Sequence, residues 1–142
     1  MKNIVIVGLD DEFVVDFAEA VALTIGFQHV NFDFEFEKEL VQSKDYPLTE
    51  VDKLMKDKET KILNHLLNKD NVVLSVSNNS FLANLKNDLF NKSFTILIER
   101  KENEKLSKNI QKLIKKYCKI SLKQEKINLN NLKSNILKHF NK

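Results

Sequence analysis

The sequence predicts a three-layer α/β/α sandwich around a five-stranded parallel sheet. Short apolar runs such as Val72-Val73-Leu74 suit strands that are buried on both faces of a parallel sheet. Amphipathic helical patterns alternate with these runs, as in α/β proteins with crossover helices. The 142 residues include only two glycines and one proline, so the connections must be short or built from Asn, Asp and Lys. A chain of this length most simply forms one domain, residues 1–142.

Five segments have the composition of strands. We expect them at Asn3–Val7, His29–Phe34, Val72–Ser75, Phe94–Ile98 and Lys119–Leu122. Phe32, Phe34 and Phe36 alternate with polar residues, which would place an aromatic surface on one face of the sheet. Such a surface is more often core or interface than a ligand pocket.

Helical patterns occupy the intervening segments. We expect helices at Asp11–Ile25, Glu35–Val41, from Thr49 onward, Ser80–Leu89, Lys105–Tyr117 and Leu129–Phe140. In the first of these, Phe13, Phe17, Ala20 and Val21 share one face. Gly26 follows as a stop signal. Thr49 followed by Asp52 has the spacing of a capping box.

Charge and cysteine content argue against several classes of protein and of binding site. The formal net charge is +3, and Arg100 is the only arginine, so bidentate arginine clamps on phosphate are scarce. The lysines from Lys101 to Lys126 have only Tyr117 among them as an aromatic, which favours a solvated helix face over a nucleic-acid surface. The single cysteine, Cys118, excludes an internal disulfide and makes a cytoplasmic location the default, and we expect it at the edge of the core. No apolar run approaches the ~18 residues of a membrane span.

The segment after the first strand has the order of a phosphate-binding loop without its residues. A strand, a glycine and a helix open P-loop proteins, with the pattern G-x-x-x-x-G-K-[ST]. Gly8 matches the first glycine, but the rest of the stretch is Leu9, Asp10, Asp11, Glu12, Phe13, Val14 and Val15. Phe13 replaces the second glycine, Val14 the lysine and Val15 the serine or threonine.

The acids in this stretch should exclude a nucleotide. A helix N-terminus offers about half a positive charge, which Asp10, Asp11 and Glu12 would already satisfy. Each carboxylate within about 4 Å of a phosphate would cost roughly 1 to 4 kcal/mol. These acids could instead hold a metal or a cationic ligand, but a well-capped helix start is the favoured interpretation. We predict no metal site, because His29, His65 and His139 have no ligand spacing.

The order and spacing of segments resemble shikimate kinase, a P-loop enzyme of the nucleoside-monophosphate-kinase type. The likeness runs from about Lys2 to Phe140. It is carried by these segments: Asn3–Gly8, Ile25-Gly26-Phe27 with Val30–Asp33, Leu48–Val51 with Met55-Lys56 and Glu59, Asn71–Ser75, Phe94–Ile98 and Leu129–Phe140. The resemblance implies a P-loop kinase fold, here with a degenerate loop and a shortened lid, since Arg100 leads directly into a lysine-rich helix.

The resemblance also implies a substrate pocket of which only parts remain. The family's D-x-D is Asn31-Phe32-Asp33, so the acid linked to magnesium is lost, while Asp33 keeps the position that would bind a substrate hydroxyl. The arginine of F-R-x-x-E is Lys56, and its acid is Glu59. The triple glycine is Ser77-Asn78-Asn79, which could bind a small ligand or form a polar turn that caps the next helix. For Asp33, Lys56 and Glu59 a surface ion pair near the sheet edge is the favoured interpretation over a remnant pocket for a polyol or carboxylate.

Three functions remain open. The leading hypothesis is a shikimate-kinase-like protein that lacks phosphoryl transfer, has no cofactor and acts in binding, regulation or assembly. The second is a divergent active kinase of aromatic amino acid biosynthesis, which would use ATP and magnesium and would recruit lysines such as Lys56 or Lys101. The third is a structural partner subunit or homodimer. A small acid or polyol is the expected ligand, and neither a membrane nor a nucleic acid is expected.

Overall fold

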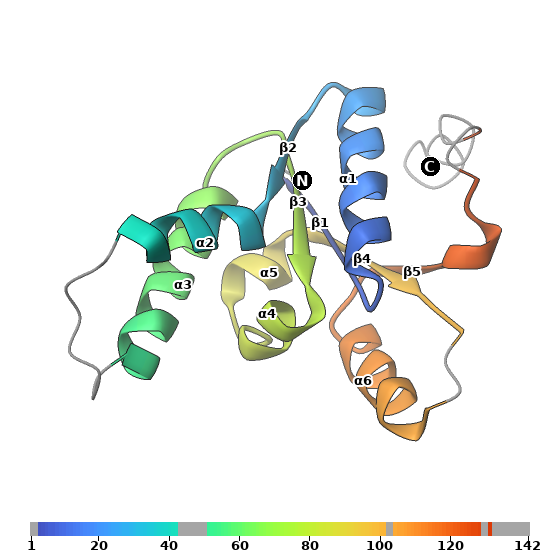
Figure 1. Cartoon of the computed structure of the whole chain (residues 1–142). Coiled ribbons are helices and arrows are strands. Elements are labelled where there is room, and N and C mark those ends of the chain that lie inside the picture. The colour runs from blue at the N-terminus through green and yellow to red at the C-terminus, as the bar shows by residue number, and fades with distance from the viewer. Residues whose placement is uncertain (1–2, 43–50, 102–103, 129–130, 132–142) are drawn as a thin grey trace.

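The computed structural model in Figure 1 describes residues 3–42, 51–101, 104–128 and 131. Its strands are β1 (Asn3–Gly8), β2 (Gln28–Asn31), β3 (Val72–Ser77), β4 (Phe94–Glu99) and β5 (Ile120–Lys123). Its helices are α1 (Asp11–Ile25), α2 (Phe32–Gln42), α3 (Val51–Leu67), α4 (Asn78–Ala83), α5 (Asp88–Lys92) and α6 (Lys105–Lys115), with a 3-10 turn at Gln124–Lys126. All five predicted strands are present, although β2 is shorter than expected.

The strands form one parallel sheet in the order β2-β3-β1-β4-β5, which confirms the predicted sheet. Gly8 at the end of β1 lies opposite Ser77 of β3 and Ile98 of β4. The carboxyl ends of the three central strands therefore meet at one edge. The segments that follow them, including the starts of α1 and α4, are brought together at that edge.

The sheet is covered by helices on both faces. Ile4 and Ile6 of β1 pack with α1, whereas Val5 and Val7 pack with α3, α4, α5 and α6 on the opposite face. This alternation follows from the two-residue period of a strand. Figure 1 shows α1 on one side of the sheet and α3 and α4 on the other. The fold class expected from the sequence is thereby confirmed.

Helix α1 has the predicted bounds. It ends at Gly26, whose φ of 78° is the left-handed conformation that glycine adopts without steric cost. The buried side chains of the helix are Val14, Phe17, Ala18, Val21 and Ala22. Phe17 and Val21 were predicted for this face, whereas Phe13 and Ala20 are only partly buried at its margin.

The predicted strand over His29–Phe34 is wrong in its second half. The strand ends at Asn31, and α2 begins at the next residue because the Asn31 side chain accepts a hydrogen bond from the Phe34 N–H at 3.3 Å. Phe32 and Phe36 are therefore stacked on one side of a helix, with ring centroids 6.0 Å apart. Phe34 is 56% exposed on the opposite side, so there is no aromatic sheet face.

The helix expected from Ser80 to Leu89 is also wrong. Ser77 caps α4 by accepting the Ser80 N–H at 3.2 Å, and a turn at Asn84 separates α4 from α5. The cap expected at Thr49 and the helix at Leu129–Phe140 lie outside the described residues. Among the described residues, whose helices are drawn in Figure 1, no helix is long and apolar enough to cross a membrane.

Candidate functional site

The junction between β1 and α1 leaves no room for an unwound loop. Only Leu9 and Asp10 separate the strand from the helix, so Glu12 to Val15 are already helical. A side chain at Gly8 would have its Cβ 2.9 Å from both the Ile98 carbonyl oxygen and Val14 Cγ2. The first turn of α1 thus packs directly against the end of the strand, and the buried Val14 side chain occupies the space beside Gly8.

The N-terminus of α1 is capped by a carboxylate of the chain itself. Asp10 accepts the Phe13 N–H at 3.2 Å, and its other oxygen accepts the Gln124 side-chain amide at 3.0 Å. The Gln124 hydrogen bond and then the Phe13 N–H hold the pKa of Asp10 below its usual value, and Arg100 contributes to the same shift. The positive end of the helix therefore already holds an anion.

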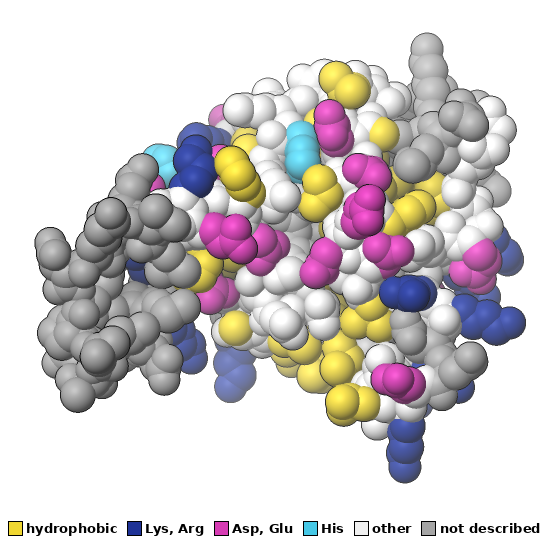
Figure 2. All heavy atoms as spheres, in the orientation of Figure 1, with side chains coloured by type: hydrophobic (Ala, Val, Ile, Leu, Met, Phe, Trp, Pro, Cys, Tyr) yellow, Lys and Arg dark blue, Asp and Glu magenta, His cyan; other side chains and the backbone are white. Residues whose placement is uncertain are grey.

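Asp11 and Glu12 add charge at the same edge. Both residues are exposed, and Figure 2 shows acidic side chains along α1 and over α2. The pKa of Asp11 is raised, first because neighbouring atoms partly desolvate its carboxylate and then because Asp33 and Asp10 repel its charge. A polyanion approaching this edge would meet the same repulsion.

Asp33 is engaged by the β3–α4 junction. One of its oxygens accepts the Ser77 N–H at 2.9 Å, and the other accepts the hydroxyls of Ser77 at 2.9 Å and Ser80 at 3.1 Å. These bonds tie the start of α2 to the start of α4. Three of the roughly four acceptor sites of this carboxylate are thereby used within the chain.

The other predicted pocket residues lie around this cluster. Glu59 of α3 accepts the Asn84 amide at 2.8 Å, and burial raises its pKa, with repulsion from Asp33 acting in the same direction. Lys56 is exposed and, within the part of the chain that the structure describes, forms no close ion pair with either carboxylate, although its charge opposes the rise in the pKa of Glu59. The surface ion pair is therefore reduced to a weak attraction between Lys56 and Glu59. The carboxylates of Asp33 and Glu59 bind serine and asparagine donors instead.

The segment Ser77-Asn78-Asn79 forms the start of α4. Ser77 is the cap, Asn78 is the first helical residue, and Asn79 is exposed. The polar-turn interpretation is confirmed, since Ser77 accepts a backbone N–H of the helix that follows. No glycine-rich turn remains here to bring backbone close to a ligand.

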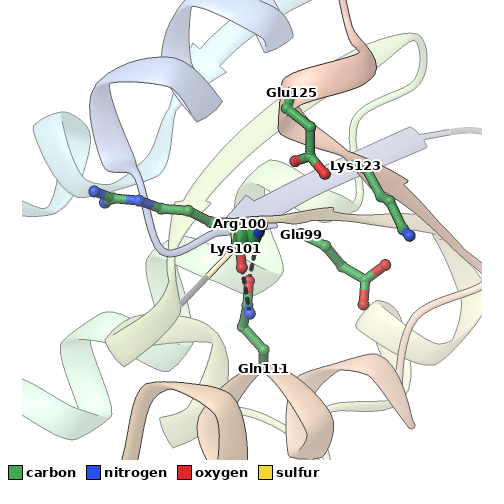
Figure 3. Close-up of a pocket in the computed structure, with 6 residues that line it drawn as sticks. All are labelled: Glu99, Arg100, Lys101, Gln111, Lys123 and Glu125. Atoms are coloured by element: carbon green, nitrogen blue, oxygen red, sulfur yellow. Dashed lines mark hydrogen bonds between the residues drawn. The ribbon is translucent and has the colours of Figure 1, made fainter. Parts of the chain in front are cut away.

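A hollow of about 370 Å³ lies beyond the carboxyl ends of β4 and β5. Its lining residues are Glu99, Arg100, Lys101, Gln111, Lys123 and Glu125. Figure 3 shows the Gln111 amide paired with the backbone of Arg100, while the Arg100 side chain points away from Glu99 and Lys123. These two hydrogen bonds, 2.7 Å and 2.8 Å long, hold α6 against the end of β4. The hollow carries three cations and two carboxylates in close proximity.

Two further candidate groups are partly buried. His29 contacts the Ser75 hydroxyl at 3.0 Å, and burial lowers its pKa. Burial raises the pKa of Cys118 to about 12, as expected of a thiol at the edge of the core. Among the described residues, no group of three or more His, Cys, Asp or Glu side chains could hold a metal ion.

Sequence reasoning missed the partners of the predicted residues. It singled out Asp10, Asp33 and Glu59 but not Gln124 or Asn84, and it read Ser80 as a helix cap rather than as a partner of Asp33. A serine near a helix start is a local signal, but the acceptor that it binds is not. Gln124 lies 114 residues from Asp10, and no local pattern connects the two.

Comparisons with known proteins agree with this geometry at the level of the fold. No protein-family model matches the chain, and no curated protein matches it. Among the solved structures that match it, three shikimate kinases cover nearly its whole length. A shikimate kinase from Bacteroides thetaiotaomicron has a TM-score of 0.68 at 12% identity and covers 99% of each chain.

Two further shikimate kinases give the same result. The enzyme from Aquifex aeolicus has a TM-score of 0.66 at 15% identity, covering 98% of this chain and 96% of its own. The enzyme from Acinetobacter baumannii, in complex with shikimate, has a TM-score of 0.66 at 12% identity, covering 97% and 92%. The chain therefore has the P-loop kinase fold of the shikimate kinases.

Proposed function

We propose that this chain is a shikimate-kinase-like protein that does not transfer phosphoryl groups and acts by binding, in regulation or assembly. The observation that supports this most strongly is the Asp10 carboxylate at the N-terminus of α1. In a P-loop the corresponding backbone N–H groups surround a phosphate, and a lysine neutralises it. Here the Asp10 carboxylate takes the place of the phosphate at these N–H groups, and Val14, whose side chain is buried, stands at the position of the lysine.

The charges at the edge argue in the same direction. Asp11 and Glu12 are exposed beside Asp10, and Asp33 is close enough to raise the pKa of Asp11. A nucleotide triphosphate would therefore approach several carboxylates without a P-loop lysine. Substituting bulky and acidic residues for the loop removes attraction and adds repulsion at once.

An assay of ADP release with ATP, magnesium and shikimate tests the proposal. We expect a rate indistinguishable from the rate without enzyme, next to an intact shikimate kinase as the positive control. Turnover above background that depends on shikimate would refute the proposal. The protein should be shown to be folded by circular dichroism in the same preparation.

A divergent active kinase remains the second candidate because of one observation. Arg100, Lys101 and Lys123 line the hollow at the carboxyl ends of β4 and β5, and Arg100 lies close enough to Asp10 to lower its pKa. These cations could neutralise phosphates that the loop cannot hold. If the ADP-release assay shows turnover, this hypothesis predicts its loss in the variant Lys101→Ala.

A small hydroxy acid is the ligand class to test first, since one structural neighbour was solved in complex with shikimate. The groups that would contact it are Asp33, Lys56, Glu59, Asn78 and Asn79. Because Asp33 already accepts three hydrogen bonds, we expect a smaller thermal shift with shikimate than an intact kinase gives.

A further inference from the structure

Helix α6 carries an apolar row of which the core covers only one member, and that one in part. Leu106 is 71% exposed, Leu113 is 41% exposed, and Tyr117, just past the end of the helix, is 40% exposed. With the partly buried Ile110, these four side chains follow one another at spacings of four, three and four residues. That spacing keeps them on one face of the helix, as in a helix–helix seam. We call these four residues the α6 seam.

A row of lysines runs beside the seam. Lys105, Lys112 and Lys116 each directly precede a residue of the exposed row, so they repeat at the same spacing about 100° around the helix. None of the three pairs with a carboxylate among the described residues, whereas Lys115 pairs with Glu99 at 3.3 Å. Like charges on one helix face are unfavourable, and an acidic partner would relieve them.

The core fixes the direction in which the seam points. Ile114 is fully buried, and the Gln111 side chain binds both backbone groups of Arg100 (Figure 3). The helix cannot rotate to bury the seam without breaking these contacts. Figure 2 shows hydrophobic side chains gathered at the lower margin of the molecule, over α4 and α6. A surface that is already oriented loses little entropy when a partner binds.

We propose that the α6 seam docks an amphipathic helix of another protein, with an acidic row next to its apolar row. Apolar residues at alternating spacings of three and four would pack on Leu106, Ile110 and Leu113, and the acidic row would face the lysines. A membrane surface fits less well, because the lysines lie along one side of the seam and the protein core occupies the other. The inference deepens the proposed function by naming a class of partner, and it rests on that function only in assuming that the chain acts by binding.

The test uses the full chain and two displayed libraries of helical peptides. Both libraries vary Leu, Ile, Val, Met and Phe at apolar positions with alternating spacings of three and four. In the acidic library the neighbouring row is Glu, and in the basic library it is Lys. We expect binders from the acidic library alone. Truncating a central anchor should weaken them about tenfold or more, so Leu113→Ala and Leu106→Ser should both lose binding. Lys112→Glu should weaken binding as well, and added salt should weaken binding to the unmodified chain.

Matched controls separate a docking site from general stickiness. Leu23 is 79% exposed on α1, so Leu23→Ser removes an exposed leucine far from the seam, and Lys92→Glu reverses a lysine on α5. Neither control should change binding. Melting temperatures of all surface variants should stay within about 2 °C of the unmodified protein.

Four results would overturn the proposal. The first is that neither library yields binders, and the second is that binders are found but are unaffected by Leu113→Ala and Leu106→Ser. The third is that the chain binds anionic phosphatidylglycerol vesicles and that Leu113→Ala abolishes this binding. The fourth is that light scattering shows self-association of the chain that Leu113→Ala abolishes. The last two would assign the seam to a membrane or to a second copy. ADP release is measured separately, so the proposed function can fail while docking succeeds, and the reverse.

Discussion

The Asp10 carboxylate links two segments that are 114 residues apart in the sequence. It accepts one hydrogen bond from the first turn of α1 and another from Gln124, and both favour its charged form. The carboxylate therefore does at this helix end what a bound anion does in a nucleotide-binding loop. A single residue thus serves as helix cap and as internal counter-ion.

Asp10→Ala should destabilise the protein by about 1 kcal/mol at pH 7, because it removes a helix cap and the partner of Gln124. The folded-state pKa of Asp10 is lowered, so its contribution is present above the unfolded value of about 3.9 and is lost as the pH falls through the folded value. Urea unfolding of both proteins should show a difference that shrinks below about pH 4. Asp16→Ala, at an exposed position of the same helix, is the control. An equal difference at pH 7 and pH 3 would contradict this role.

The Cys118 thiol should be nearly unreactive in the folded protein. Burial raises its pKa to about 12, so very little thiolate exists at pH 8. We expect Ellman's reagent to react about 100-fold more slowly with the native protein than with the protein in denaturant. Reaction at similar rates in the two states would show that the thiol is accessible and ionised, as the neighbouring lysines alone would suggest.

Asp33 acts at the level of elements, because it joins α2 to the junction of β3 and α4. Its three hydrogen bonds go to Ser77 and Ser80, and Ser77 in turn caps α4. The starts of α2 and α4, which lie far apart in the sequence, are thereby bonded to each other.

Asp33→Ala should cost on the order of 2 kcal/mol, since the Ser77 N–H and two hydroxyls would lose their acceptor. Chemical denaturation measures this directly. Asp57→Ala removes an exposed acid from α3 and should change stability by less than about 0.5 kcal/mol. If the two variants were equally stable, Asp33 would be open to a ligand rather than committed to the fold.

The elements that the sequence predicted well are those with a local signal. The continuous apolar run of β1 and the helical period of α1 with Gly26 after it lie within their own segments. The start of α2 was misplaced because alternating phenylalanines resemble the pattern of a strand. The Asn31 side chain, which accepts the Phe34 N–H, favours a helix start at the same place. The candidate acids were found from their positions, but their partners depend on how distant segments meet in the fold.

Across the whole molecule, acidic and basic side chains gather on different helices. Figure 2 shows acidic side chains over α1 and α2, whereas α6 is rich in lysine. The carboxyl ends of β1, β3 and β4 meet at the edge where the exposed acids Asp11 and Glu12 begin α1. A polyanion that approached this edge would meet carboxylates of the chain.

Isothermal titration with ATP and magnesium tests whether the start of α1 can hold a nucleotide. Because Asp10 occupies the α1 N-terminus and Val14 fills the space beside Gly8, we predict no binding at nucleotide concentrations up to about 1 mM, where even weak affinity of about 4 kcal/mol would be seen. A dissociation constant in the micromolar range would contradict the account and would show that the chain binds phosphates by another arrangement of its residues.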